Sequence, residues 1–232
     1  MAKTYEAMQK SHELSQSGWH FLDIQNKKQI GYLEKTILNL NQNKGMKVFN
    51  FTSSRSGEGV TTILINLLNY FKFQKSGKRV LAIDAHLQSP SFHAVFQLDE
   101  NRGLTDLISE SLPLSEAIQT VAPGSLDVVA SGEGHSKMSG ELAPGKIVSL
   151  VDEAKALYDY IFIDSAPILS SSDALATALA ADATFLVIQS LKVQRDVARR
   201  AKILLDNNEC HIAGVLLNRN GQVIPEWIYR IV

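Results

Sequence analysis

The sequence predicts an α/β fold in which helices cover both faces of a mostly parallel central sheet. Short apolar runs alternate along the chain with longer stretches of helical apolar periodicity. Runs such as 160–163 and 184–188 are continuously apolar, which is typical of strands buried on both faces of a parallel sheet. With 232 residues and 45% hydrophobic content, the chain can bury one full core. We therefore expect a single α/β domain.

The N-terminal part is expected to differ from the rest. Residues 1–27 are polar and weakly periodic, and we interpret them as a flexible or loosely docked arm. Residues 28–42 carry apolar positions at helical spacing, and Asn43-Lys44-Gly45 would end that helix. The single domain would then comprise residues 28–232.

From residue 47 onward, strands and helices alternate. The expected strands are Lys47–Thr52, Arg79–Asp84, Leu126–Ala130, Tyr160–Asp164, Ala183–Gln189 and His211–Leu217. The expected helices are Val60–Lys75, Gly140–Tyr158, Ser172–Ala180 and Val193–Asn207. Two loop-like segments, 88–103 and 131–139, follow the carboxyl ends of strands, where open α/β sheets bind their ligands.

Charge and cysteine content limit the function classes. The formal net charge is −1, so no strong overall field attracts nucleic acid or anionic lipid, although a local basic patch remains compatible with it. One cysteine, Cys210, excludes an internal disulfide framework. We find no signal peptide and no apolar run of membrane-spanning length. We expect a cytoplasmic protein that reaches the membrane only through a partner.

A glycine-rich turn between the first expected strand of the domain and the next helix has the pattern of a P-loop. The stretch Ser56-Gly57-Glu58-Gly59-Val60-Thr61-Thr62 provides the backbone N–H groups that cradle phosphate oxygens. Thr61 stands where a hydroxyl binds Mg²⁺, but Val60 stands where a lysine would reach the β- and γ-phosphates. The alternative is an ordinary glycine-rich strand-to-helix turn.

Two more strands end in carboxylates. Asp84 closes the strand that begins at Arg79, and Asp164 closes the strand that begins at Tyr160. Two strand-end carboxylates beside a P-loop can hold Mg²⁺ or its waters, with Thr61 as a third ligand. The alternative for each aspartate alone is a turn or helix cap.

This ordered set of motifs resembles the cytoplasmic kinase module of the bacterial tyrosine kinases (BY-kinases). That family lies within the MinD/ParA-like deviant Walker group and works with capsular and exopolysaccharide export systems. The resemblance runs from about Gln29 to the C-terminus. Gly57-Glu58-Gly59 is similar to the family's Gly-Glu-Gly-Lys loop, and the strands ending at Asp84 and Asp164 are similar to its second Walker motif and Walker B. Further matching segments are 172–174, 214–219 and 224–230.

The resemblance implies a fold, ligands and partners. ATP or ADP with Mg²⁺ would bind at the P-loop, and Asn218 would lie near the adenine base. The partner would be the cytoplasmic tail of a Wzz-like membrane polysaccharide co-polymerase, and the chain would form homo-oligomers. Tyr229 would be the phosphoacceptor, and Asp84 would be catalytic if activity remains.

This chain departs from the family pattern mainly at positions that take part in nucleotide binding, catalysis and self-association. Val60 replaces the Walker lysine; in the second Walker motif, which Asp84 begins, His86 replaces the second aspartate and Gln88 replaces the arginine. The oligomerisation motif Glu-x-x-Arg-x-x-Arg is reduced to Gln29, Tyr32 and Lys35, and the tyrosine-rich tail to Tyr229. We therefore expect nucleotide binding to be weakened or lost.

The sequence leaves three functions open. The first is a pseudokinase that regulates or scaffolds exopolysaccharide synthesis and export. The second is an active autokinase, in which Arg55 replaces the missing lysine, or His86 acts as a base or metal ligand beside Asp84. The third is a MinD/ParA-like positioning ATPase, which requires nucleotide-dependent dimerisation.

Overall fold

The computed structural model of the chain describes residues 21–24, 27–73, 77–109 and 112–218. The described strands form one sheet in the order β1-β8-β7-β2-β6-β3-β5-β4, and every neighbouring pair is parallel except β4 with β5. The strands are β1 (Phe21–Ile24), β2 (Val48–Ser53), β3 (Val80–Ala85), β4 (Ile118–Ala122), β5 (Leu126–Val129), β6 (Tyr160–Ser165), β7 (Ala183–Gln189) and β8 (Ile212–Asn218). The expected α/β class with a mostly parallel sheet is confirmed.

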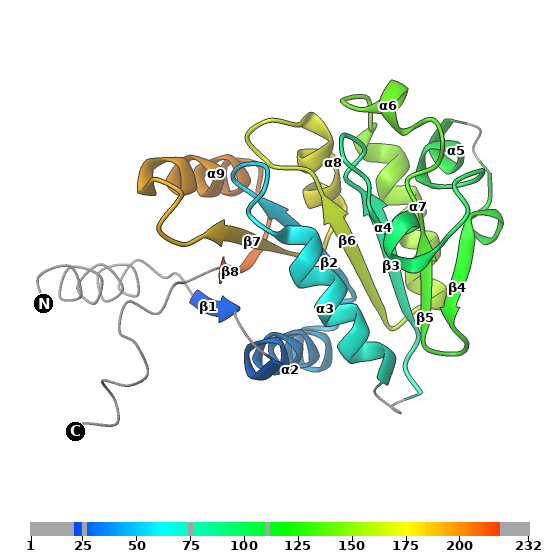
Figure 1. The fold of residues 1–232 in the computed structure, drawn as a ribbon, viewed down its shortest axis with the longest axis horizontal. Helices are drawn as coiled ribbons and strands as arrows, with labels where there is room; N and C mark the ends of the chain where they lie inside the picture. The colour runs from blue at the N-terminus through cyan, green and yellow to red at the C-terminus, as the bar shows by residue number, and fades with distance from the viewer. Residues whose placement is uncertain (1–20, 25–26, 74–76, 110–111, 219–232) are drawn as a thin grey trace, which may run out of the picture.

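Helices cover both faces of this sheet (Figure 1). They are α2 (Lys27–Lys44), α3 (Val60–Phe73), α4 (Phe92–Phe96), α5 (Leu104–Ser109), α6 (His135–Met138), α7 (Pro144–Leu157), α8 (Ser172–Ala180) and α9 (Arg195–Asn207), with a short 3-10 turn at Leu114–Glu116.

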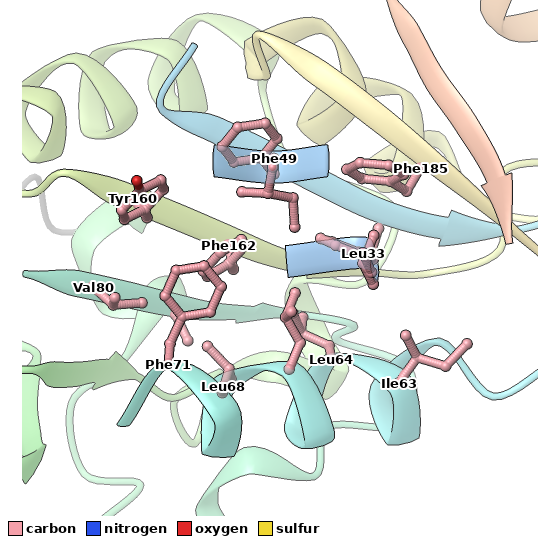
Figure 2. Packing of buried hydrophobic residues seen from close by; sticks show 14 of the residues in the cluster. Leu33, Phe49, Ile63, Leu64, Leu68, Phe71, Val80, Tyr160, Phe162 and Phe185 are labelled. Carbon is pink, nitrogen blue, oxygen red and sulfur yellow. The ribbon is translucent and has the colours of Figure 1, made fainter. Parts of the chain in front are cut away.

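On one face, α2 and α3 pack against the central strands. Phe49, Phe162 and Phe185 from three neighbouring strands meet Leu33 of α2 and Phe71 of α3, as Figure 2 shows. The Phe71 and Phe162 ring centroids lie 5.3 Å apart. Burying one such aromatic side chain stabilises the fold by about 1.5–3 kcal/mol. This core supports the segment between β2 and α3, because it fixes both elements.

On the other face, α7 and α8 pack over β3 and β6, while α8 and α9 pack over β7 and β8. Alternate residues of each strand face these two layers. In β6, for example, Phe162 faces α3, whereas Ile161 and Ile163 face α7 and α8. This alternation explains why the central strands are apolar at nearly every position.

The amino edge of the sheet is held by charged groups. The Asp182 carboxylate accepts hydrogen bonds from the backbone N–H groups of Lys47 (2.8 Å) and Val48 (2.9 Å) and from Lys155 Nζ (3.0 Å). Asp159 in the same way accepts from the Arg79 backbone N–H and from Lys78 Nζ. These bonds tie the starts of β2, β3, β6 and β7 to the end of α7.

The six strands expected from apolar runs are all present, with ends that agree to within one residue. The helix expected from residue 140 begins only at Pro144, because Ala143 is extended and proline suits the first position of a helix. The loop-like segments 88–103 and 131–139 contain the short helices α4 and α6.

Part of the segment expected to be a loose arm joins the fold. Phe21–Ile24 forms β1, which pairs with β8 at one end of the sheet. At the opposite end, β4 is an antiparallel strand that the sequence analysis did not predict. Its residues are partly exposed, so it has no continuous apolar run. Among the described residues, no helix is long and apolar enough to cross a bilayer.

Candidate functional site

The glycine-rich turn lies at the carboxyl edge of the sheet, between the end of β2 and the start of α3 (Figure 1). Gly57 and Gly59 have φ angles of 81° and 94°, a region that glycine enters without strain. α3 begins at Val60, so the free N–H groups of its first turn face this edge. Strand, turn and helix therefore have the arrangement that a phosphate cradle needs.

A buried carboxylate closes the turn from within. Glu58 is almost fully buried; its Oε1 accepts a hydrogen bond from Ser54 Oγ (2.7 Å) and its Oε2 from the Ser54 backbone N–H (3.1 Å). Burial raises the pKa of Glu58, and the Ser54 hydroxyl works in the opposite direction. The contact between Ser54 and Glu58 could not be predicted, because a four-residue spacing outside a helix carries no contact signal. The turn is thus held in shape by its own side chains.

The end of β8 touches the turn. Asn218 Nδ2 donates a hydrogen bond to the Glu58 carbonyl oxygen (2.8 Å). A Cβ atom added to Gly59 would lie 2.1 Å from the same Nδ2 atom. Asn218 was expected near an adenine base, which stays a prediction. The structure adds that its amide group holds the backbone of the turn.

The close approach at Gly59 leads to a stability prediction. We expect Gly59→Ala to lower the free energy of unfolding by about 2–3 kcal/mol, because alanine is strained at this φ and also displaces Asn218. Gly57→Ala is the matched control, since Gly57 also has a positive φ but no atom within 4 Å of the added Cβ. It should cost about 1 kcal/mol. Urea unfolding of both variants measures the difference, and equal losses would contradict the contact with Asn218.

The residue in the lysine position belongs to the core. Val60 is only 7% exposed and is part of the apolar cluster that α3 forms with the sheet. The sequence predicted that position 60 lacks the phosphate-binding lysine of a P-loop. The structure adds that the side chain at position 60 is buried, and burial of an apolar side chain stabilises the fold.

The two strand-end aspartates are neighbours. Asp84 and Asp164 are paired residues on adjacent strands, and both are fully buried on the α3 side of the sheet. Asp84 accepts hydrogen bonds from the backbone N–H groups of Ser91 (2.8 Å), Phe92 (2.9 Å) and His86 (3.3 Å). Its oxygens are therefore already used to hold the loop that leads into α4. This is the capping alternative that the sequence left open.

Asp164 is in a different state. Both carboxylate oxygens of Asp164 are buried, and within the described part of the chain neither makes a well-formed hydrogen bond; the Thr61 hydroxyl lies close enough to act on the carboxylate without such a bond. Burial and the negative charge of Asp84 raise the pKa of Asp164 well above its usual value, and the Thr61 hydroxyl opposes this rise. Burial also raises the pKa of Asp84, and its three backbone bonds oppose it. A buried carboxylate without a well-formed hydrogen bond indicates that a cation or water completes the site.

These features partly fit Mg²⁺ and a nucleotide. Asp164 and Thr61 provide free or hydroxyl oxygens of the kind that Mg²⁺ prefers, whereas Asp84 is engaged with backbone. Among the described residues, no group of three or more His, Cys, Asp or Glu side chains forms a cage for a metal. A metal here would therefore need ligands from water or phosphate, as Mg²⁺ in nucleotide sites has.

The remaining expected site residues lie at the rim. Ser56, Thr62 and Arg55 are exposed, and the Arg55 carbonyl oxygen accepts a hydrogen bond from Ser53 Oγ (2.8 Å). His86 is half-buried, and burial lowers its pKa while the Asp84 charge opposes this. Tyr229, the expected phosphoacceptor, lies outside the described residues.

A cavity of about 640 Å³ lies elsewhere, between α4 and β4, and is lined by no residue of the turn.

Comparison with known proteins places the chain in a family. The AAA domain family matches residues 46–222. Tyrosine-protein kinase YwqD of Bacillus subtilis is 35% identical over 173 residues, which cover 75% of this chain and 72% of YwqD. The chain belongs to the bacterial tyrosine-kinase family.

Solved structures share the fold of this chain. The chimerical protein CapA2B2 superposes with a TM-score of 0.76 at 22% identity, over 90% of this chain and 97% of that chain. The septum site-determining protein MinD of Pyrococcus horikoshii, complexed with Mg-ADP, has a TM-score of 0.62 at 23% identity, over 80% of this chain and 77% of MinD. At these identities the likeness shows a shared fold.

Proposed function

We propose that this member of the bacterial tyrosine-kinase family is a pseudokinase that regulates or scaffolds exopolysaccharide synthesis and export. The observation that carries this proposal is Val60, an apolar side chain buried in the core at the position of the phosphate-binding lysine. His86 and Gln88 add to it, because they replace charged groups at the same edge of the sheet.

The expected cost of the lost cation is large. Phosphoryl transfer depends on positioning and charge stabilisation rather than on covalent protein chemistry. Removing one partner of a buried charge pair costs about 3–5 kcal/mol. By rate arithmetic this is a loss of about 10²- to 10⁴-fold. Efficient turnover is therefore not expected from this site.

The residues that remain still suit a weak nucleotide site. The N–H groups of the glycine-rich turn would hold phosphate oxygens, and Asp164 and Thr61 would hold Mg²⁺. Bound Mg²⁺ would neutralise phosphate charge. Glu58 would keep the turn open through its bonds to Ser54. We propose that ATP or ADP binding is weakened or lost while the shape of the site persists.

The partner that we propose is the cytoplasmic tail of a Wzz-like membrane polysaccharide co-polymerase. The structural match to the chimerical protein CapA2B2 and the names CapB and CpsD among the relatives support a capsule-related role. Self-association is also proposed, although Gln29, Tyr32 and Lys35 have replaced the charged residues of the family motif.

A direct test measures binding and turnover with the purified full-length chain. Labelled ADP and ATP are titrated with Mg²⁺, and phosphotyrosine is measured after incubation with Mg-ATP, with YwqD as the active reference. We expect a dissociation constant at least about 100-fold weaker than that of YwqD and no phosphotyrosine. Sub-micromolar binding together with turnover would overturn the proposal.

One observation keeps an active autokinase as the second candidate. Arg55 is exposed at the turn, and its charge acts on Glu58. If Arg55 replaces the lysine, Tyr229 becomes phosphorylated, and both Arg55→Ala and Asp84→Ala abolish the signal. The MinD/ParA-like ATPase alternative requires dimers that form only with nucleotide.

A further inference from the structure

Exposed residues lie on the outer side of α9 and in the turn before it, and Arg195, Arg199 and Ile203 share one side of the helix. Leu191, Arg195, Arg199 and Ile203 follow one another at intervals of four residues. Val197, Ala201 and Leu205, on the other side of the helix, are buried against the sheet. Leu191 is 78% exposed and Ile203 is 43% exposed, so this series begins and ends with an apolar side chain. We call these four residues, with Lys192 and Arg200, the α9 stripe.

The α9 stripe is strongly basic. Lys192, Arg195, Arg199 and Arg200 are all exposed, and none of them takes part in an ion pair within the described residues. Asp196 is the one acidic residue between positions 191 and 203. This concentration of positive charge contrasts with the net charge of −1 for the whole chain.

The backbone of Leu191 has an unusual conformation, and its side chain is exposed. Its φ angle is 62°, in the left-handed region that residues other than glycine rarely enter. This backbone holds a large apolar side chain in solvent, although burial would stabilise it. Local strain of this kind is often found at functional positions. The observation therefore indicates a surface that Leu191 meets outside the fold.

We propose that the α9 stripe lies on an anionic lipid surface, with Leu191 inserted at the headgroup level. The α9 stripe follows the outward side of a packed helix, and none of its residues lines the cavity between α4 and β4. A surface with an exposed apolar side chain before the helix, arginines along it and an apolar side chain further on suits a plane, because arginine stems cover apolar surface while their charged groups reach phosphates. An acidic peptide is less suited, since it would need a groove.

The expected affinity of the α9 stripe for anionic lipid is too weak to hold the chain at a membrane by itself. Each Lys or Arg near an anionic leaflet strengthens binding by about fivefold, and the effect falls off within a Debye length. Four such cations give weak, salt-sensitive attachment that needs a second signal to become stable. The contact goes beyond the proposed docking on a membrane partner, because it involves lipid directly.

The test uses the full-length chain and sedimentation with vesicles. Vesicles of phosphatidylcholine with 30% phosphatidylserine are compared with pure phosphatidylcholine at 0.05 M and 0.3 M salt. We expect binding to the anionic vesicles alone, weakened at the higher salt. The double variant Arg195→Glu and Arg199→Glu should lose about 25-fold or more in affinity, since two favourable charges are removed and reversed. Leu191→Ser should weaken binding about tenfold without changing its salt dependence.

The matched control is the double variant Lys44→Glu and Lys137→Glu, which changes the net charge equally at exposed positions away from α9. It should bind anionic vesicles like the unmodified chain. Equal losses in the two double variants, or no binding to phosphatidylserine at 0.05 M salt, would overturn the proposal. So would capture of an acidic polyglutamate peptide, lost in the α9 variant, without vesicle binding. Circular dichroism confirms that each variant is folded.

Discussion

Replacing Val60 by lysine is expected to restore Mg-ADP binding by at least about 100-fold. The glycine-rich turn has the strand-turn-helix geometry of a phosphate cradle, and under the proposed function a cation added to it would be worth about 3–5 kcal/mol. The lysine stem can occupy part of the apolar site of Val60 while its charged end extends toward the turn. Isothermal titration with Mg-ADP measures the gain, which is independent of whether phosphoryl transfer returns.

A neutral control separates charge from size. Val60→Met enlarges the side chain at the same position without adding charge, so it should leave Mg-ADP binding unchanged. Both variants should unfold at somewhat lower urea concentration than the original chain, because each disturbs a packed residue. If Val60→Lys binds Mg-ADP no better than Val60→Met, the cradle itself has lost its function.

The second large effect is expected from Asp164→Asn in the absence of Mg²⁺. Asp164 is fully buried, and neither oxygen makes a well-formed hydrogen bond within the described residues. Its pKa is raised by burial and by the charge of Asp84, so the folded state holds this proton more tightly than the unfolded chain does. Asparagine has the same shape and no charge to bury. We therefore expect the variant to be more stable than the original chain at neutral pH.

The pH dependence follows from the direction of this shift. A raised carboxyl pKa contributes no loss of stability below the unfolded value of 3.8, and stability is lost as pH rises from there through the folded pKa. Within that window the advantage of Asp164→Asn should grow by up to about 1.4 kcal/mol per pH unit. Urea unfolding between pH 4 and pH 8 with a chelator present measures it. A difference that does not change with pH would contradict a buried, proton-binding Asp164.

Asp182→Asn is the matched control of opposite sign. Burial alone would raise the pKa of Asp182, but the backbone N–H groups of Lys47 and Val48 and the Lys155 ammonium group lower it. Its stabilising effect is therefore present above pH 3.8 and lost as pH falls through the lower folded pKa. The variant should be less stable than the original chain at neutral pH, with the difference shrinking in acid.

The sequence predicted the sheet well because its central strands are buried on both sides. Runs such as 160–163 have no polar interruption, which is typical of strands buried on both faces of a parallel sheet. The partly exposed β4 lacked such a run and was missed. Phe21–Ile24 was missed as well, because a four-residue strand at the end of a sheet depends on its partner β8 more than on its own pattern.

The site was predictable in its positions but not in its contacts. Strand-end location placed Asp84 and Asp164 at one edge, and the structure pairs them as neighbours. Spacing could not tell that Asp84 is held by three backbone N–H groups while Asp164 makes no well-formed hydrogen bond within the described residues, because this depends on the path of the loop from 86 to 92. The bond from Asn218 to Glu58 joins residues 160 positions apart, beyond any local signal.

The charged ties around Asp182 and Asp159 lie at the amino edge of the sheet, while the glycine-rich turn lies at the carboxyl edge. The residues that tie the strands together are therefore different from those of the glycine-rich turn. Substitutions such as the valine at position 60 can accumulate at one edge without loosening the other. Substitutions in the glycine-rich turn can therefore change its chemistry while the rest of the fold keeps its stability.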